Sequence, residues 1–273
     1  MEKIEEGDIV SRKSYNGDIL FTVEKFFNSS KGLKIYILRG LTIRIIADSY
    51  ENDLIIVDKK YARDSIRNLD KRIDKRINNL FNKKFNTSKG RNYTGVKTGR
   101  ILHLDGDKLY SEKSAKYYKK AGLDAIVKYV PENKQPAFIE EYIEKYSPDV
   151  LVLTGHDGMI KKGIKYGDIY NYRNSKYFIQ GVSTARRIIP SSNKLAIFAG
   201  ACQSFFEAIM VSGANFASSP GRILIDFMDP LIVAEKIAIT DKKKFITIND
   251  IEKELRDGKK SINGSGVTGK KQL

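Results

Sequence analysis

The sequence is poor in residues that cross-link a chain or ligate a metal. Its 273 residues include one cysteine, two histidines and no tryptophan. A single cysteine cannot form an internal disulfide bond, which is typical of a protein from a reducing compartment. The set is also too small for a closed zinc site of the usual Cys/His type. We therefore expect no metal and no other cofactor, and a chain of this length can bury a core without such staples.

Long apolar runs are also missing. Residues 1–10 mix charges of both signs and lack the apolar segment of a secretion signal, and Glu207 interrupts the apolar stretch around Cys202. We expect a cytoplasmic protein that makes no contact with a membrane. Walker and dinucleotide-binding glycine patterns are absent too, which argues against a phosphate-binding module.

Acidic residues are scarce in one segment. Between Lys59 and Arg100 there are fourteen Lys or Arg and three Asp, so this segment carries +11 of the formal net charge of +16. Such a basic segment suits binding to nucleic acid, which is the alternative function for this chain. Few aromatic side chains are interleaved with the basic ones, however, so a base-stacking platform is poorly supported.

The pattern of apolar residues and turns predicts an α/β protein with four parts. Residues 1–58 contain five short strand patterns, which favour a small SH3-like β-barrel. Residues 59–97 form a basic helical segment with an apolar stripe, followed by a linker. In 98–257, strand and helix patterns alternate, which predicts a mostly parallel sheet flanked by helices on both faces. A helix is predicted over 248–257. Residues 258–273 are rich in Gly and Lys, which predicts a flexible tail.

Chemistry-bearing residues follow three of the predicted strands of 98–257. Asp105 and Asp107 follow the first, His156 and Asp157 the third, and Cys202 the fourth. Taken singly, each has a plainer interpretation, as a turn residue or a small buried hydrophobe. Because the carboxyl ends of parallel strands meet at one edge of a sheet, we expect these residues to lie together.

The sequence pattern around Cys202 favours nucleophilic catalysis. We expect the sulfur of Cys202 and the imidazole of His156 to lie within hydrogen-bonding reach, and a helix over 204–213 to place its positive end at the thiol. Nearby glycines would let the backbone N–H groups of Cys202, Asp157 and Gly158 approach a developing oxyanion. The His lies 46 residues before the Cys, which is the order and spacing of the caspase pattern.

Long motifs resemble a known family. They are GDIVSRKSY at 7–15, LTGHDG at 153–158, YRNSKYFIQGVSTAR at 172–186 and IFAGACQSFFEAIMVSGANFASSPGR at 197–222. These motifs are similar to the YabG family of sporulation-specific proteases, and the resemblance spans nearly the whole chain. The two blocks that end in His and in Ala-Cys also resemble the wider clan of cysteine peptidases that contains caspases, gingipains, clostripain, legumain and separase.

The resemblance implies a caspase-like fold and a thiol endopeptidase that cuts after basic residues, Arg preferred. Cys202 matches the family's nucleophile and His156 its base, although Asp157 stands where the clan usually has Gly. Members that cut after Arg place an acid at the end of the first strand, so Asp105 and Asp107 are the candidates for the substrate-binding acid.

The resemblance also implies partners and a location. The substrates would be spore coat and germination proteins, processed in the mother cell of a sporulating bacterium at the forming spore coat. Some such enzymes process themselves, and the basic segment suggests self-cleavage between about Arg63 and Arg100. Intact-mass comparison of the wild type with Cys202→Ala would test that hypothesis.

Overall fold

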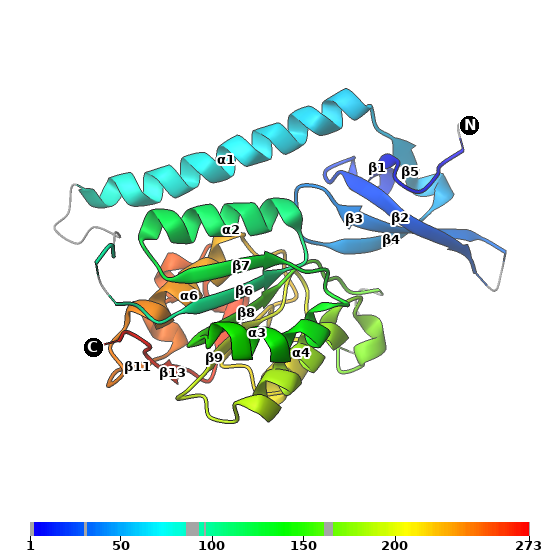
Figure 1. Ribbon diagram of the computed structural model, residues 1–273. Helices are drawn as coiled ribbons and strands as arrows, with labels where there is room; N and C mark the ends of the chain where they lie inside the picture. The colour runs from blue at the N-terminus through cyan, green and yellow to red at the C-terminus, as the bar shows by residue number, and fades with distance from the viewer. Residues whose placement is uncertain (1–2, 30–31, 86–92, 96, 161–165, 273) are drawn as a thin grey trace.

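The computed structural model describes residues 3–29, 32–85, 93–95, 97–160 and 166–272. They form a mixed α/β protein in which a small N-terminal sheet lies beside a larger sheet covered by helices (Figure 1). Figure 1 also shows a long helix, α1, running along the outside of the larger layer. No helix among these residues is long and apolar enough to span a membrane.

The N-terminal sheet is antiparallel and open. Its five strands occur in the order β4-β3-β2-β1-β5. They are β1 (Ile9–Arg12), β2 (Phe21–Asn28), β3 (Lys34–Gly40), β4 (Ile46–Tyr50) and β5 (Leu54–Ile56). The edge strands β4 and β5 form no ladder with each other in the described part of the chain, so the closed barrel expected from the sequence is not found. Next to the start of β4, Ile45 instead forms a parallel bridge with Asp157 of the larger unit.

The basic segment forms helix α1 (Lys59–Phe85), as its apolar stripe predicts. Ile73 and Ile77 of the stripe are buried in the core beside α2. Lys113 of α2 (Lys108–Ala121) also pairs with Asp74 at 2.9 Å. The stripe therefore docks α1 on the larger unit while most of its basic side chains remain on the surface. Most of the predicted linker, 86–92 and 96, lies outside the described residues.

The larger sheet has six strands in the order β12-β10-β9-β8-β6-β7. They are β6 (Ile101–Asp105), β7 (Ala125–Tyr129), β8 (Val150–Thr154), β9 (Ala196–Ala199), β10 (Phe216–Ser218) and β12 (Ile262–Gly264). All neighbouring pairs are parallel except β10 with β12. After β7 the chain crosses back over β6 to form β8, so the strand order reverses at the β6–β8 pair. Ligands bind at such a reversal, beyond the carboxyl ends of the strands.

Helices cover both faces of this sheet. The apolar core on one face includes residues of α1, α2 and α6 (Met228–Ile239), and the core on the other includes residues of α3 (Gln135–Tyr146), α4 (Ser175–Ile188) and α5 (Phe206–Val211). Side chains alternate along each strand, so Ile101 of β6 faces the first core and Leu102 the second. The same alternation puts His103 and Asp105 on the face of Ile101.

The C-terminal residues differ from the expectation. β12 completes the edge of the large sheet, and β13 (Val267–Thr268) pairs with β11 (Phe245–Ile246). Ile262 and Val267 are fully buried, so the predicted flexible tail is wrong for these residues. Strand β12 covers the otherwise unpaired edge of β10. This pairing is a tertiary contact, which a Gly- and Lys-rich composition does not predict. The helix expected over 248–257 is also replaced by short 3-10 turns.

Candidate active site

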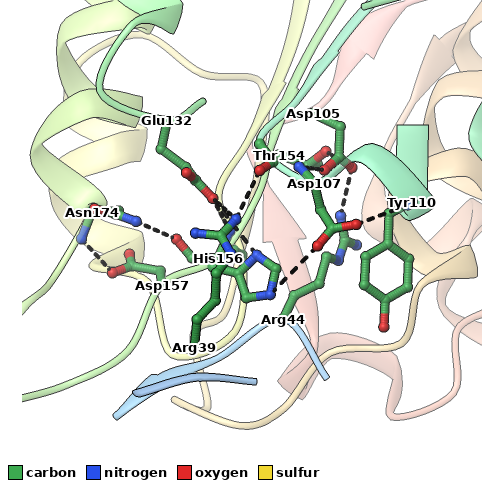
Figure 2. A network of polar contacts seen from close by, with 12 residues as sticks. Arg39, Arg44, Asp105, Asp107, Tyr110, Glu132, Thr154, His156, Asp157 and Asn174 are labelled. Atoms are coloured by element: carbon green, nitrogen blue, oxygen red, sulfur yellow. Dashed lines mark hydrogen bonds and ion pairs between the residues drawn. The ribbon is translucent and has the colours of Figure 1, made fainter. Parts of the chain in front are cut away.

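The candidate site lies where the carboxyl ends of β6 and β8 meet the N-terminal sheet. Residues 40–46, which connect β3 to β4 and are called the covering segment below, contact this edge at several points. Figure 2 shows Arg39 and Arg44 reaching from the N-terminal sheet toward the acidic side chains of the larger unit. Asp105, Asp107 and His156 therefore lie near one another, beneath another part of the chain.

Cys202 is fully buried. It belongs to the apolar core of the N-terminal sheet, together with Ile45 of the covering segment. Burial raises the pKa of its thiol from 9.0 to about 11, against a smaller lowering by the Arg44 charge. Helix α5 begins only at Phe206, so the predicted helix end at the thiol is not found. In this arrangement the sulfur is a neutral, covered thiol at neutral pH.

His156 follows β8 and is also fully buried. Its Nε2 lies 3.1 Å from the carbonyl oxygen of Gly40, which can only accept a hydrogen bond, so Nε2 carries a proton and donates to that oxygen. Nδ1 is buried without a hydrogen-bond partner. No hydrogen bond joins His156 to Cys202, two residues that the structure describes in full. The predicted thiol–imidazole hydrogen bond is thus not formed in this structure.

Glu132, in the loop after β7, holds the backbone at His156. Its Oε1 accepts a hydrogen bond of 2.6 Å from the His156 N–H and lies 3.7 Å from Nδ1. A Cβ on Gly106 would lie 2.3 Å from Glu132 and one on Gly155 2.5 Å, so both glycines permit this approach. Burial raises the pKa of Glu132, but the hydrogen bond from His156 and the charge of Arg39 outweigh it and lower that pKa to about 2.

The depressed pKa of Glu132 predicts an acid-sensitive fold. Because the folded-state pKa of about 2 lies below the ordinary value of 4.5, the stabilisation is complete above about pH 4.5 and is lost as the pH falls toward 2. We expect Glu132→Gln to flatten the fall in unfolding free energy over that window, measured by urea denaturation at a series of pH values. Glu140→Gln, which removes an exposed carboxylate, is the control. Equal slopes for both variants would contradict the assignment.

Asp105 is fully buried at the end of β6 and anchors a chain of hydrogen bonds. Its Oδ2 accepts from Thr154 Oγ1 at 2.7 Å, and Thr154 Oγ1 lies 2.6 Å from His103 Nε2. Since the single Thr154 proton goes to Asp105, His103 Nε2 donates to Thr154 and its Nδ1 accepts from Tyr118 at 3.2 Å. Burial, helped by the Arg44 charge, lowers the pKa of His103 to about 3, so the ring is neutral.

The partner of Asp105 is the guanidinium of Arg44. Arg44 Nη1 lies 2.9 Å from Asp105 Oδ2, and both side chains are buried. The guanidinium carbon lies 5.0 Å from the centre of the Tyr110 ring (Figure 2). A carboxylate and an aromatic face together form a pocket that matches a guanidinium group. Asp107 differs, because its side chain caps α2 by accepting from Tyr110 N at 3.1 Å, and its Oδ2 lies 3.9 Å from His156 Nε2.

Asp157 connects three loops around the site. Its carboxylate accepts hydrogen bonds from Asn174 N at 2.7 Å, Ser204 Oγ at 2.8 Å and Gly158 N at 2.8 Å. It also accepts from the Ser175 hydroxyl. Burial raises its pKa, and these hydrogen bonds oppose the rise. The N–H of Gly158, an expected oxyanion donor, is therefore engaged by Asp157 in this arrangement.

Comparison with known proteins identifies the family. A family model described as YabG peptidase U57 matches residues 5–273, nearly the full length. The chain belongs to the YabG peptidase family. It is 38% identical, over 274 residues, to the sporulation-specific protease YabG of Bacillus subtilis (strain 168), and the match covers 96% of this chain and 94% of that protein. No solved structure was found to match it.

For a YabG-family peptidase, the structure adds residues that the sequence did not single out. Glu132 follows the second parallel strand, so the rule that places ligands beyond strand ends could have found it. Arg39 donates to Glu132 at 3.1 Å and to Gly106 O at 2.7 Å. No local sequence pattern marks Arg39 or Arg44 as a site residue, because each reaches the site only through the docking of the N-terminal sheet on the larger unit.

Proposed function

We propose that this YabG-family peptidase is a cysteine endopeptidase that cuts after basic residues, with Arg preferred. Cys202 is the nucleophile, His156 the general base and Asp105 the acid that binds the substrate side chain. The observation that supports the proposal is that the strands preceding these three residues, β6, β8 and β9, are parallel neighbours in one sheet, within a family of peptidases. Asp105 is preferred to Asp107, because it already holds a guanidinium while Asp107 caps a helix.

The proposed reaction is acyl transfer through a thioester. With the site uncovered, His156 takes the proton of Cys202, and the sulfur attacks the backbone carbonyl carbon of the substrate Arg. The imidazolium gives this proton to the leaving amine as the peptide bond breaks. A water molecule, deprotonated by His156, then hydrolyses the thioester and restores the thiol. This sequence needs no metal and no other cofactor.

Backbone N–H groups would stabilise the oxyanion. Cys202 and Asp157 offer donors next to the reacting groups, and Gly158 offers a third once its N–H leaves the Asp157 carboxylate. Another part of the chain already approaches the backbone of Gly158 closely, because a Cβ at this position would lie 2.0 Å from the Ile46 carbonyl oxygen. A glycine at this position therefore leaves room for a substrate backbone as well.

The biological setting follows from the relative. Because the similar protein of Bacillus subtilis is named a sporulation-specific protease, we propose that this chain acts in sporulation, in the mother cell, on spore coat and germination proteins. The parallel sheet with helices on both faces supports a caspase-like core.

Self-cleavage between about Arg63 and Arg100 remains part of the proposal, with one structural constraint. Arg63, Arg67 and Arg76 lie within α1, and a peptidase must unwind a helix to bind it as an extended strand. We therefore place self-cleavage between α1 and β6, where Arg91 lies outside the described residues. Arg100 is disfavoured, because its carbonyl oxygen accepts a hydrogen bond from Val150 N at 3.0 Å and Ile101 after it is buried in β6. Intact-mass measurement of the wild type beside Cys202→Ala tests this, and equal full-length masses would contradict it.

Digestion of a peptide library tests the proposed specificity. We expect the wild type to cut after Arg, and less often after Lys, and we expect Cys202→Ser to cut nothing. The residue before each cut is read by mass spectrometry. Cuts distributed over other residue types would contradict the Asp105 pocket, whereas cuts that persist in Cys202→Ser would contradict the nucleophile.

A further inference from the structure

The covering segment contacts each part of the proposed catalytic site at once. Arg44 fills the Asp105 pocket, and the carbonyl of Gly40 accepts the Nε2–H of His156 at 3.1 Å. Ile46 donates its N–H to the Asp157 carbonyl oxygen at 2.9 Å, as an added strand does. Ile45 joins the apolar core that buries Cys202. These seven consecutive residues therefore fill the Asp105 pocket, bind the proposed base His156 and help to bury the proposed nucleophile Cys202.

Backbone hydrogen bonds also hold the segment in a tight turn. Gly40 N donates to Ile45 O at 2.9 Å, and Ile45 N donates to Ile43 O at 2.9 Å, which closes a tight turn. A Cβ on Gly40 would lie 2.3 Å from the Ile43 carbonyl oxygen, so only glycine fits this position. A preformed turn pays little conformational entropy when it occupies a site. Its closed shape also differs from the extended strand that a peptidase needs for cleavage.

The buried charges indicate a contact that is not optimised for stability alone. Only Nη1 of Arg44 is hydrogen-bonded to Asp105, and Nη2 is buried without a partner. His156 Nδ1 is likewise unpartnered. Buried ion pairs with unsatisfied donors contribute little to folding compared with an apolar replacement. An arginine substrate that donates two N–H groups to Asp105 would bind this pocket more completely.

We propose that residues 40–46 are an internal inhibitor, anchored by Arg44 as a substitute for the substrate arginine, and that the described arrangement is the latent form of the enzyme. Activation requires the N-terminal sheet to move and withdraw Arg44 from Asp105. This inference rests on the proposed function, and it explains why a peptidase of this family has its candidate nucleophile and base fully buried.

The test compares two arginine variants of the full chain. Arg44→Gln removes the anchor, whereas Arg173→Gln breaks another ion pair between the two units, that of Arg173 with Asp48 at 2.6 Å, away from the Asp105 pocket. The first readout is the rate at which iodoacetamide alkylates the thiol. Because the chain has one cysteine, the intact mass reports the reaction of Cys202 alone. The second readout is hydrolysis of a short peptide amide of Arg and aminomethylcoumarin.

We expect Arg44→Gln to raise both rates by roughly tenfold or more, because the competent fraction of the protein increases. Arg173→Gln is expected to stay near the wild type. Benzamidine, which carries a guanidinium-like amidinium, is expected to raise the melting temperature of Arg44→Gln and leave that of the wild type unchanged. Arg44→Lys keeps a buried cation and tests the same point with a smaller rise if Arg44→Gln fails to fold.

Three results would overturn the inference. They are wild-type rates in both Arg44 variants, an equal rise in Arg173→Gln, and benzamidine stabilisation of the wild type. The proposed function fails separately, because it requires that Cys202→Ala abolish hydrolysis in the Arg44→Gln chain. A fast-reacting thiol in Arg44→Gln without peptide hydrolysis would support the covering role and contradict the peptidase site.

Discussion

Replacing Cys202 by Ala is expected to lower kcat/KM for Arg-containing peptides by roughly 10⁴-fold or more, because removal of a covalent nucleophile leaves only binding and oxyanion stabilisation. The measurement is made in the wild-type chain and in the Arg44→Gln chain, so that a covered site cannot hide the loss. The fold should persist, because Cys202 is a small buried side chain and Ala loses one atom of packing.

The control for Cys202→Ala is a thermal unfolding curve, which is expected to stay close to that of the wild type. Val211→Ala, a truncation at a highly exposed position of α5, is expected to keep full hydrolysis and serves as the matched variant. If Cys202→Ala retains activity and melts normally, then the thiol is a packing residue and another group must be the nucleophile.

Neutralising Asp105 is expected to remove the preference for Arg. The clean comparison is Asp105→Asn in the Arg44→Gln chain, because Asp105→Asn alone would leave the Arg44 charge buried and unpaired. Relative to Arg44→Gln, the double variant is expected to lose about 100-fold in kcat/KM for a peptide with Arg before the cut, since a buried guanidinium loses its carboxylate partner. A peptide with Gln at that position should lose far less.

The second acid provides the matched comparison. Asp107→Asn, also in the Arg44→Gln chain, is expected to keep the preference for Arg, because the Asp107 side chain caps α2. It is expected to weaken that cap by about 1 kcal/mol at most. Loss of the Arg preference in Asp107→Asn but not in Asp105→Asn would reverse the assignment of the two acids.

The alternating pattern of residues 98–240 predicted much of the large sheet and its helices, because strands buried on both faces read as continuous apolar runs. The rule that parallel strand ends share one edge also led us to expect Asp105 and His156 at the same edge, and β6 and β8, which precede them, pair in parallel. Both predictions depend on local patterns that a single sequence carries.

The covering of the site could not be predicted from the sequence. Burial of Cys202 depends on Ile45, which is far from it along the chain, and on the docking of β4 against Asp157. From the sequence we expect a thiol at a helix end within reach of His156, whereas the structure has a buried thiol without either contact. The prediction of a flexible C-terminal tail was wrong for a similar reason, because β12 is a strand only through its pairing with β10.

The most direct test is to label the enzyme with an irreversible probe, a short peptide that ends in an arginyl acyloxymethyl ketone. Such a probe needs an arginine pocket and a reactive thiol together. We expect a single adduct on Cys202 by peptide mapping, formed faster in Arg44→Gln than in the wild type and blocked by Asp105→Asn in the Arg44→Gln chain. A probe ending in leucine that labels Cys202 equally fast, or an arginyl probe that leaves Cys202 of Arg44→Gln unlabelled, would contradict the account.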